Sequence, residues 1–202
     1  MQQHQANITT VILAGGAARR MGGEDKGVTL LNGKAMISYV IERLAPQSSA
    51  LTINCNRSQQ AYAKFGYPLI EDTISGGLGP LAGVLSALEL SDSDYVLSVP
   101  CDTPLLPTDL IERMLQAIEK EGAEACTVND GDRLHPVVLL VKRSVLTGLR
   151  SYLSGGGRKV HDWFYNIPHC SADFSDQPEA FININTPQQL ATLQQRLQQR
   201  VG

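Results

Sequence analysis

The feature that most constrains the fold is a short apolar run that ends abruptly in a glycine-rich, cationic segment. Residues 8–14 read ITTVILA, a β-branched run typical of a buried strand, and residues 15–27 follow as GGAARRMGGEDKG. Glycines let the main chain approach an anion closely and adopt positive φ, and such strand-to-loop junctions present backbone N–H groups to phosphate. This arrangement predicts an α/β protein that binds a nucleotide.

The same segment excludes two common nucleotide-binding motifs. A P-loop requires Ser or Thr directly after its lysine, whereas Lys26 is followed by Gly27. A dinucleotide fingerprint requires G-x-G-x-x-G with an acidic residue about 20 positions later, and the spacing here is G-G-x-x-x-R-M-G-G. A bare glycine-rich turn is as compatible with a tight strand-to-helix connection as with phosphate binding, so the specificity lies in the complete string.

Length and charge set further limits. The chain has 202 residues without a repeat or linker, so we expect a single domain over residues 1–202. A chain of this size buries roughly 70% of its unfolded surface and needs no metal or disulfide to fold. The net charge of −3 argues against binding nucleic acid through a basic surface, and the lack of an 18-residue apolar run predicts no membrane span.

The cysteines and the N-terminus bear on location. The four cysteines are dispersed, without a C-x-x-C pair or metal-ligand spacing, which predicts reduced thiols in a cytoplasmic protein. Residues 1–7 are polar and lack an apolar h-region, so no secretory signal is expected.

Strand-like and helix-like segments alternate along the chain. This alternation predicts a three-layer α/β/α fold with a mostly parallel sheet covered on both faces. Strands are expected at residues 8–14, 51–54, 67–70, 95–99, 123–128, 137–141 and 180–184. Helices are expected at residues 35–44, 59–65, 81–90, 108–121, 144–151 and 187–200. Thr186 before Pro187 is typical of a helix start, with a capping hydroxyl and proline at the first helical position.

Polar residues follow four of the predicted strands. Gly15 follows the first strand, Asn54 ends the second, Asp72 comes just after the third and Asp102 just after the fourth. Ligands of parallel sheets gather beyond the carboxyl ends of the strands. We therefore expect these four positions to meet at one cleft.

Asp102 follows the most continuous apolar strand of the chain. A carboxylate there suits Mg²⁺, which takes one or two carboxylates and completes its shell with phosphate and water; alternatively, Asp102 only begins the turn before Thr103. Asp72 is compatible with a loop cap, a nucleotide contact or support of the site. Asn54 is compatible with a simple turn or with contact to ribose or base.

The string from Leu13 to Lys26 resembles the molybdenum cofactor guanylyltransferases, the MobA type of the nucleotidyltransferase superfamily. Members of that family carry L-A-G-G-x-x-x-R-M-G-x-x-D-K. Further landmarks follow in family order at residues 54, 72, 79–83 (GPLAG), 100–104 (PCDTP), 135–136 (HP) and 183–187 (NINTP). The resemblance covers nearly the whole chain and implies a Rossmann-like nucleotidyltransferase fold. It also implies Mg²⁺-dependent transfer of GMP from GTP to the phosphate of molybdopterin, with release of pyrophosphate.

The resemblance also implies roles for individual residues. It places Mg²⁺ on Asp102, and it places Lys26 and Arg20 at the departing pyrophosphate, so these three residues are the expected catalytic set. Guanine recognition is expected from the backbone of Leu13, Ala14 and Gly15. The expected nucleotide-binding residues are Leu13, Ala14, Gly15, Gly16, Lys26, Asn54, Asp72 and Asp102.

The N-terminal half is thus expected to bind GTP and the C-terminal half molybdopterin. Asn183 and Asn185 alternate at the end of a predicted strand and so point the same way, which suits a polar ligand, although an ordinary turn is the alternative. Arg158 and Lys159 follow a glycine run and are candidates for the pterin's phosphate. The family often has two arginines there, and lysine lacks the bidentate fork. His135 matches a family landmark, and we interpret it as a structural histidine.

An acceptor phosphate is already anionic at neutral pH, so the expected reaction needs no general base. Three alternatives stay open. A related nucleotidyltransferase using CTP or another NTP on a pterin or sugar phosphate is the nearest, although cytidylyltransferases tend to carry L-A-A-G where this chain has LAGG. A non-catalytic nucleotide-binding regulator would be expected to lack Asp102 or Lys26. A dehydrogenase is the third alternative, and it is disfavoured because the dinucleotide fingerprint is missing. The expected partners are GTP and molybdopterin, and other cofactor-biosynthesis proteins and molybdoenzyme chaperones are further candidate partners.

Overall fold

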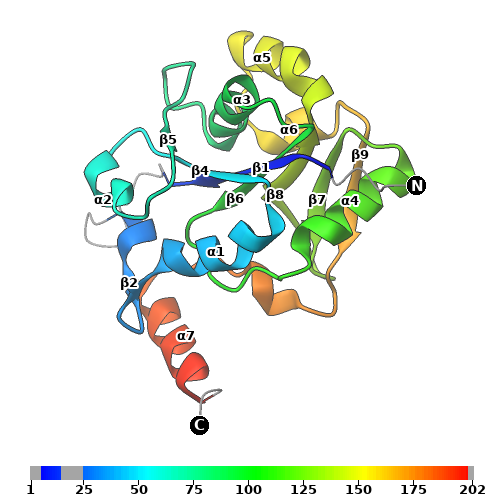
Figure 1. Ribbon diagram of the computed structural model, residues 1–202. Helices are drawn as coiled ribbons and strands as arrows, with labels where there is room; N and C mark the ends of the chain where they lie inside the picture. Colours follow the sequence, from blue (N-terminus) through cyan, green and yellow to red (C-terminus); the bar gives the residue numbers. More distant parts are fainter. Residues whose placement is uncertain (1–5, 15–24, 200–202) are drawn as a thin grey trace.

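The apolar runs assemble into one central sheet. The computed structural model describes residues 6–14 and 25–199, which form a seven-stranded sheet in the order β5-β4-β1-β6-β8-β7-β9 (Figure 1). The strands are β1 (Ile8–Leu13), β4 (Ala50–Asn54), β5 (Leu69–Ile70), β6 (Tyr95–Pro100), β7 (Ala125–Asn129), β8 (Leu134–Lys142) and β9 (His169–Asp173). β8 runs antiparallel to both of its neighbours, and the other pairs are parallel.

Helices cover both faces of this sheet. The longer helices are α1 (Met36–Leu44), α3 (Pro80–Leu90), α4 (Leu110–Glu121) and α5 (Leu146–Ser154), with α2 (Gln59–Ala63) and α6 (Val160–Phe164) as single turns or little more. One buried core joins α1 and α4 to one face of the sheet, and a second core joins α3, α5 and α6 to the other. The predicted three-layer, mostly parallel α/β/α fold is confirmed.

The remaining elements are small or peripheral. A hairpin of β2 (Leu30–Leu31) and β3 (Lys34–Ala35) packs with the last helix, α7 (Pro187–Gln199), through a third apolar cluster. The Gln189 N–H donates to Thr186 Oγ1 over 3.2 Å, so the predicted cap of this helix is confirmed. Short 3₁₀ turns lie at Lys26–Val28, Ala45–Gln47, Arg143–Val145 and Pro178–Phe181. Within the described residues, no helix is long and apolar enough to cross a membrane.

The predicted strand at residues 180–184 is wrong. The segment begins in the 3₁₀ turn and continues as extended chain outside the sheet. Phe181 is fully buried against Phe174, with ring centroids 5.2 Å apart, so its apolarity serves this side contact rather than a strand. The segment crosses the strand ends, where the Ile184 N–H donates to the Asp102 carbonyl over 2.9 Å.

Candidate active site

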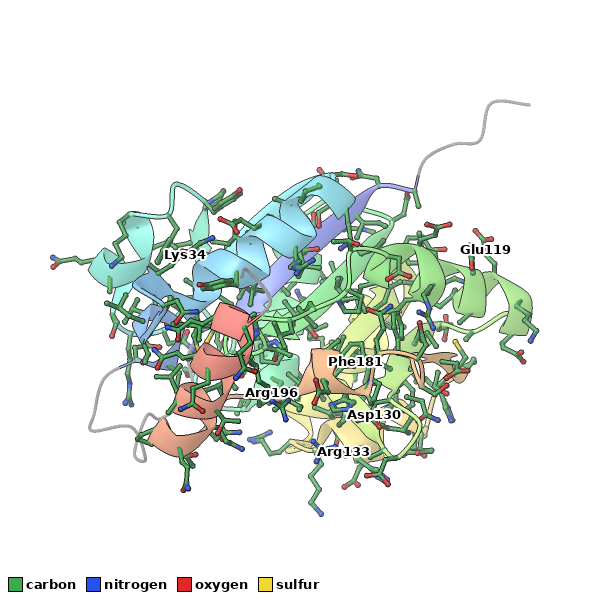
Figure 2. All side chains as sticks on the ribbon, turned by 90° about the horizontal axis from the view of Figure 1, so that it is seen from below. Lys34, Glu119, Asp130, Arg133, Phe181 and Arg196 are labelled. Atoms are coloured by element: carbon green, nitrogen blue, oxygen red, sulfur yellow. The ribbon has the colours of Figure 1, made fainter. Side chains whose placement is uncertain are left out.

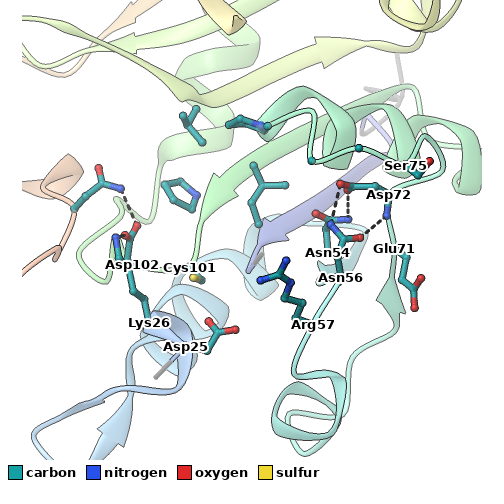
Figure 3. Close-up of a pocket in the computed structure, with 18 residues that line it drawn as sticks. Asp25, Lys26, Asn54, Asn56, Arg57, Glu71, Asp72, Ser75, Cys101 and Asp102 are labelled. Carbon is teal, nitrogen blue, oxygen red and sulfur yellow. Dashed lines mark hydrogen bonds and ion pairs between the residues drawn. The ribbon is translucent and has the colours of Figure 1, made fainter. Parts of the chain in front are cut away.

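A cleft of about 740 Å³ opens beyond the carboxyl ends of the parallel strands (Figure 3). Leu13, Asn54, Asp72 and Asp102 all line it, although they come from four separate segments. The expectation that polar residues after successive strands share one cleft is therefore confirmed for Asn54, Asp72 and Asp102. Gly15, together with the predicted Gly16 and Arg20, lies outside the described residues.

The end of β1 is fixed between its two neighbours at the floor of this cleft. The Ala14 N–H donates to the Asn54 carbonyl over 2.9 Å, and the Cys101 N–H donates to the Leu13 carbonyl over 3.2 Å. The Ala14 N–H and the Leu13 carbonyl, two of the backbone groups expected to recognise guanine, therefore already form hydrogen bonds within the sheet. These bonds hold Leu13 and Ala14 beside Asn54 and beside Cys101, the residue before Asp102.

Asp102 is the centre of a polar cluster that joins distant parts of the chain (Figure 3). Its side chain is only 9% exposed, and its carboxylate accepts from Lys26 Nζ over 3.1 Å and from Asn183 Nδ2 over 2.7 Å. Lys26 also donates to Asn185 Oδ1. The structure thus unites four residues that the sequence assigned to different halves of the molecule. The side chains of Asn183 and Asn185 both point to the pair formed by Asp102 and Lys26, as predicted, although neither asparagine lies on a strand.

Tyr62 and Gly27 position Lys26. A Cβ atom at Gly27 would lie 2.6 Å from Tyr62 Oη and 3.2 Å from Cys101 Sγ, so only glycine fits after the lysine. The Tyr62 hydroxyl donates to the Asp25 carboxylate next to Lys26. Burial raises the pKa of Tyr62 well above its usual value, and Cys101 and Asp25 add to the rise, so the hydroxyl keeps the proton that it donates. Sequence reasoning did not identify Tyr62, because an isolated tyrosine in a helical segment carries no motif.

The donor set at Asp102 fits Mg²⁺ better than a metal held by protein alone. Across residues 6–14 and 25–199, no three His, Cys, Asp or Glu side chains are grouped to bind a metal ion. Asp102 offers a single hard oxygen donor at the cleft floor, beside a lysine and two amides. Mg²⁺ commonly uses one or two carboxylates and takes its other ligands from substrate phosphates and water. Asp102 is the residue that would bind it.

A second polar network lines the cleft after β4 and β5 (Figure 3). The two carboxylate oxygens of Asp72 accept separately, from Asn54 Nδ2 over 3.0 Å and from Asn56 Nδ2 over 2.8 Å. Asn56 Oδ1 accepts in turn from the Asp72 N–H over 2.8 Å. Hydrogen bonds therefore fix Asp72 in its loop, and Asp72 also lines the cleft. Asn56 was not predicted, although its spacing of two from Asn54 in INCN was a usable signal.

Glycines bring α3 against the side of the cleft that Leu13 and Asn54 line. Gly79 has φ of +80°, which turns the chain into the helix at Pro80. A Cβ atom at Gly83 would lie 2.5 Å from Leu13 Cδ2 and 2.7 Å from Asn54 Oδ1. The helix can pack this closely only because Gly83 has no side chain. Its N-terminus, where free N–H groups and the helix dipole favour an anion, therefore borders the cleft.

Other predicted residues lie outside this constellation. Arg158 and Lys159 are exposed and do not line the cleft; Arg158 Nη1 donates to the carbonyls of Leu153 and Gly157, and Lys159 lies 3.8 Å from Asp162. The Arg158 carbonyl lies 3.7 Å from the Cβ position of Gly79, which places this segment at the cleft rim. Arg57, which was not predicted, lines the cleft and points into it (Figure 3).

Comparisons with known proteins agree with this geometry. Residues 10–169 match the family described as MobA-like NTP transferase domain. The molybdenum cofactor guanylyltransferase of Shewanella sp. (strain W3-18-1) is 52% identical over 184 residues, 91% of this chain and 94% of that protein. The protein of the same name from Shewanella loihica is 51% identical over 191 residues, 94% of this chain and 97% of that one.

Solved structures show the same fold. Molybdopterin-guanine dinucleotide biosynthesis protein A from Archaeoglobus fulgidus superposes with a TM-score of 0.77 at 22% identity, covering 95% of this chain and 99% of that one. The 4-diphosphocytidyl-2C-methyl-D-erythritol synthase of Anaerococcus prevotii gives 0.74 at 10% identity, over 96% and 97%. The family match and the relatives of about 50% identity define the chain as a nucleotidyltransferase. With half of its residues identical to curated relatives, the chain belongs to the MobA-like NTP transferase family, as its motifs predicted.

Proposed function

We propose that this protein transfers GMP from GTP to the terminal phosphate of molybdopterin, forming molybdopterin guanine dinucleotide and releasing pyrophosphate. The observation that carries the proposal is the contact of Lys26 and Asp102 with Asn183 and Asn185. In this proposal the contact holds the groups for phosphate chemistry between the cleft, where GTP would lie, and the C-terminal segment that carries the two amides. The names of the relatives supply the identity of the two substrates.

Each residue of the cluster has a distinct task in such a transfer. Lys26 carries a positive charge that can move from Asp102 to the triphosphate and stabilise the departing pyrophosphate, as Arg20 of the same loop would. The amides of Asn183 and Asn185 orient the acceptor phosphate beside the α-phosphate. Asp102 would bind Mg²⁺, which when present neutralises charge on the phosphate oxygens. The acceptor phosphate has a second pKa of about 6 and needs no general base, so positioning supplies much of the catalysis.

The nucleotide side of the cleft has its own set of residues. Asn54 and the fixed carboxylate of Asp72 face the base or ribose, and the N-terminus of α3 borders the phosphates. Leu13 lines the part of the cleft on which the nucleotide would lie, and the buried Ala14 fixes the end of β1 there through its bond to Asn54. In this proposal Arg158 and Lys159, at the rim, reach the pterin's phosphate only after their side chains turn from their present partners. The pterin would come from other cofactor-biosynthesis proteins and leave with molybdoenzyme chaperones.

Pyrophosphate release tests the proposal directly. The protein with GTP, Mg²⁺ and molybdopterin is expected to release one pyrophosphate for each dinucleotide formed. Calorimetric titration with GTP and with CTP, in the same buffer, distinguishes the nearest alternative, since a clear preference for CTP contradicts the assignment. Binding of GTP without any pyrophosphate release would instead indicate a non-catalytic regulator.

A further inference from the structure

A second cavity adjoins the main cleft. It has a volume of about 190 Å³ and shares Pro100, Val137 and Asn183 with the cleft lining. Its other walls come from Arg133, Leu134, His135, Pro136 and Val138 of β8 and the turn before it. Because Asn183 bonds to Asp102 on one side and lines this cavity on the other, a ligand whose phosphate lies at Asp102 can extend past Asn183 into it.

A buried histidine with a defined tautomer lines this cavity. His135 is 8% exposed, and its Nε2 lies 2.6 Å from Asp130 Oδ2. Burial raises the pKa of Asp130, but hydrogen bonds from His135 and from the Arg133 and Asp132 N–H groups more than offset this and lower it to about 2. The ionised carboxylate can only accept, so Nε2 carries the shared proton. With its proton on Nε2, the neutral form of the ring has Nδ1 as a hydrogen-bond acceptor.

The contacts of His135 fix its ring but leave Nδ1 unused. Phe181 packs at 5.3 Å between ring centroids, and Thr127 Oγ1 donates to the His135 carbonyl over 2.8 Å. Figure 2 shows Asp130, Arg133 and Phe181 together at this end of the molecule. No described residue forms a hydrogen bond with Nδ1. Within the described ranges, the side-chain polar atoms that are fully buried without a partner are those of Ser91 and Thr103, so Nδ1 is not among them. The structural interpretation of His135 is thus confirmed for Nε2, and the residue also lines the second cavity.

The surrounding groups select a type of ligand. Pro100 and Pro136 supply apolar walls, the exposed guanidinium of Arg133 supplies donors, and Nδ1 of His135 supplies an acceptor. Asn183 donates one N–H of its Nδ2 to Asp102, so its Oδ1 and its second N–H are left for a ligand. A flat heterocycle with N–H donors next to a carbonyl acceptor on one edge complements this set. The amino-pyrimidinone edge of a pterin has that pattern.

We propose that this cavity receives the heterocycle of the acceptor, and that His135, oriented by Asp130, accepts a hydrogen bond from its amino-pyrimidinone edge. His135 is then a specificity-determining residue and Asp130 a positioning residue. The inference rests on the proposed function, because a pterin is the acceptor assigned there. It goes further by locating the ring on the β8 side of Asn183.

Two substitutions separate this role from a structural one. His135→Gln retains an amide donor for Asp130 but has no acceptor on Cγ, where the ring carries Nδ1. Asp130→Asn keeps the shape of the side chain, and its Oδ1 keeps the bonds from the Asp132 and Arg133 N–H groups. Its NH2 group then faces Nε2, so the neutral ring carries its proton on Nδ1 and is a donor there. His161→Gln, at an exposed histidine outside the cavity, is the matched control. The probe is free pterin (2-amino-4-oxopteridine), titrated by its own fluorescence, with thermal unfolding and calorimetric GTP binding measured on every variant.

Both cavity variants are expected to bind pterin about tenfold more weakly, the loss of one hydrogen bond. GTP affinity is expected to stay at the wild-type value, and His161→Gln to behave as wild type. Lumazine, which carries a carbonyl in place of the 2-amino group, tests the wild-type protein without any substitution and is expected to bind about tenfold more weakly than pterin. Equal affinity for the two rings, or unchanged pterin binding in folded His135→Gln, overturns the inference.

The same measurements keep the two proposals apart. Pterin binding through His135 without transfer of GMP would leave the cavity assignment intact and refute the proposed reaction. Transfer of GMP at wild-type acceptor KM by both cavity variants would refute the cavity assignment and leave the reaction intact.

Discussion

Replacing Gly83 with alanine tests how closely α3 packs against the nucleotide side of the cleft. The new Cβ atom would lie 2.5 Å from Leu13 Cδ2 and 2.7 Å from Asn54 Oδ1, both inside van der Waals contact. The leucine methyl can rotate away, but the Asn54 amide is bonded to Asp72 over 3.0 Å and to the Ile70 carbonyl over 3.4 Å. Relief of the clash therefore displaces either the helix or Asn54.

The magnitude follows from two opposing effects. Overpacking a core position costs about 1–3 kcal/mol, while alanine in place of glycine in a helix contributes about 1 kcal/mol of stability. Gly83→Ala should therefore lower the free energy of unfolding by about 1 kcal/mol, and the Tm by about 2–4 °C. GTP affinity should fall as well, because Leu13 and Asn54 both line the cleft.

Gly148→Ala is the matched control, since its Cβ atom in α5 would have no heavy atom within 4 Å outside its own helix. There the helix propensity acts alone, so the free energy of unfolding should rise by about 0.5–1 kcal/mol. Urea unfolding measures both variants, and calorimetry measures their GTP affinity. If Gly83→Ala is as stable as Gly148→Ala and binds GTP like the wild type, the proposed close packing is refuted.

Two further perturbations probe the supports of the site. Tyr62→Phe removes the hydroxyl that donates to Asp25. Urea unfolding should show that the free energy of unfolding falls by about 1–2 kcal/mol, and turnover should fall because Lys26 is held less firmly. Unchanged stability and turnover would contradict the role given to Tyr62. The pKa of Asp130 in the folded protein is about 2, below its ordinary value of 3.8. Asp130 therefore stabilises the protein at pH values above 3.8, and this contribution is lost as the pH falls towards about 2. Unfolding measured across this range should show a steeper acid loss in the wild type than in Asp130→Asn, and parallel curves would contradict that assignment.

Much of the fold could be predicted because its strands and helices have clear periodicity. The buried face of α1, which was predicted as a helix over residues 35–44, consists of apolar residues at helical spacing, including Ile37, Val40 and Leu44. β9 was not predicted, since HCSAD offers a single alanine at its buried position and gains its order from pairing with β7. The segment at 180–184 looked like a strand because Phe181 and Ile184 are apolar, but both are buried in side contacts. Such contacts depend on residues distant in the chain.

The candidate site divides in the same way. Strand-end residues such as Asn54 and Asp102 were predictable, because parallel topology brings strand ends to one edge. The bond from Lys26 to Asn185 was not, since 159 positions separate the two residues and no local pattern links them. The free nitrogen of His135 was equally hidden, because its orientation depends on Asp130 and the packing of Phe181.

Turnover of Asp102→Asn tests the central claim most directly. The substitution preserves the shape of the side chain and an oxygen for Asn183, but removes the charge that pairs with Lys26 and would bind Mg²⁺. Pyrophosphate release from GTP, Mg²⁺ and molybdopterin should fall by about a hundredfold or more, while the calorimetric Kd for GTP changes far less. Wild-type turnover from this variant would remove Asp102 from the mechanism and contradict the proposed enzyme.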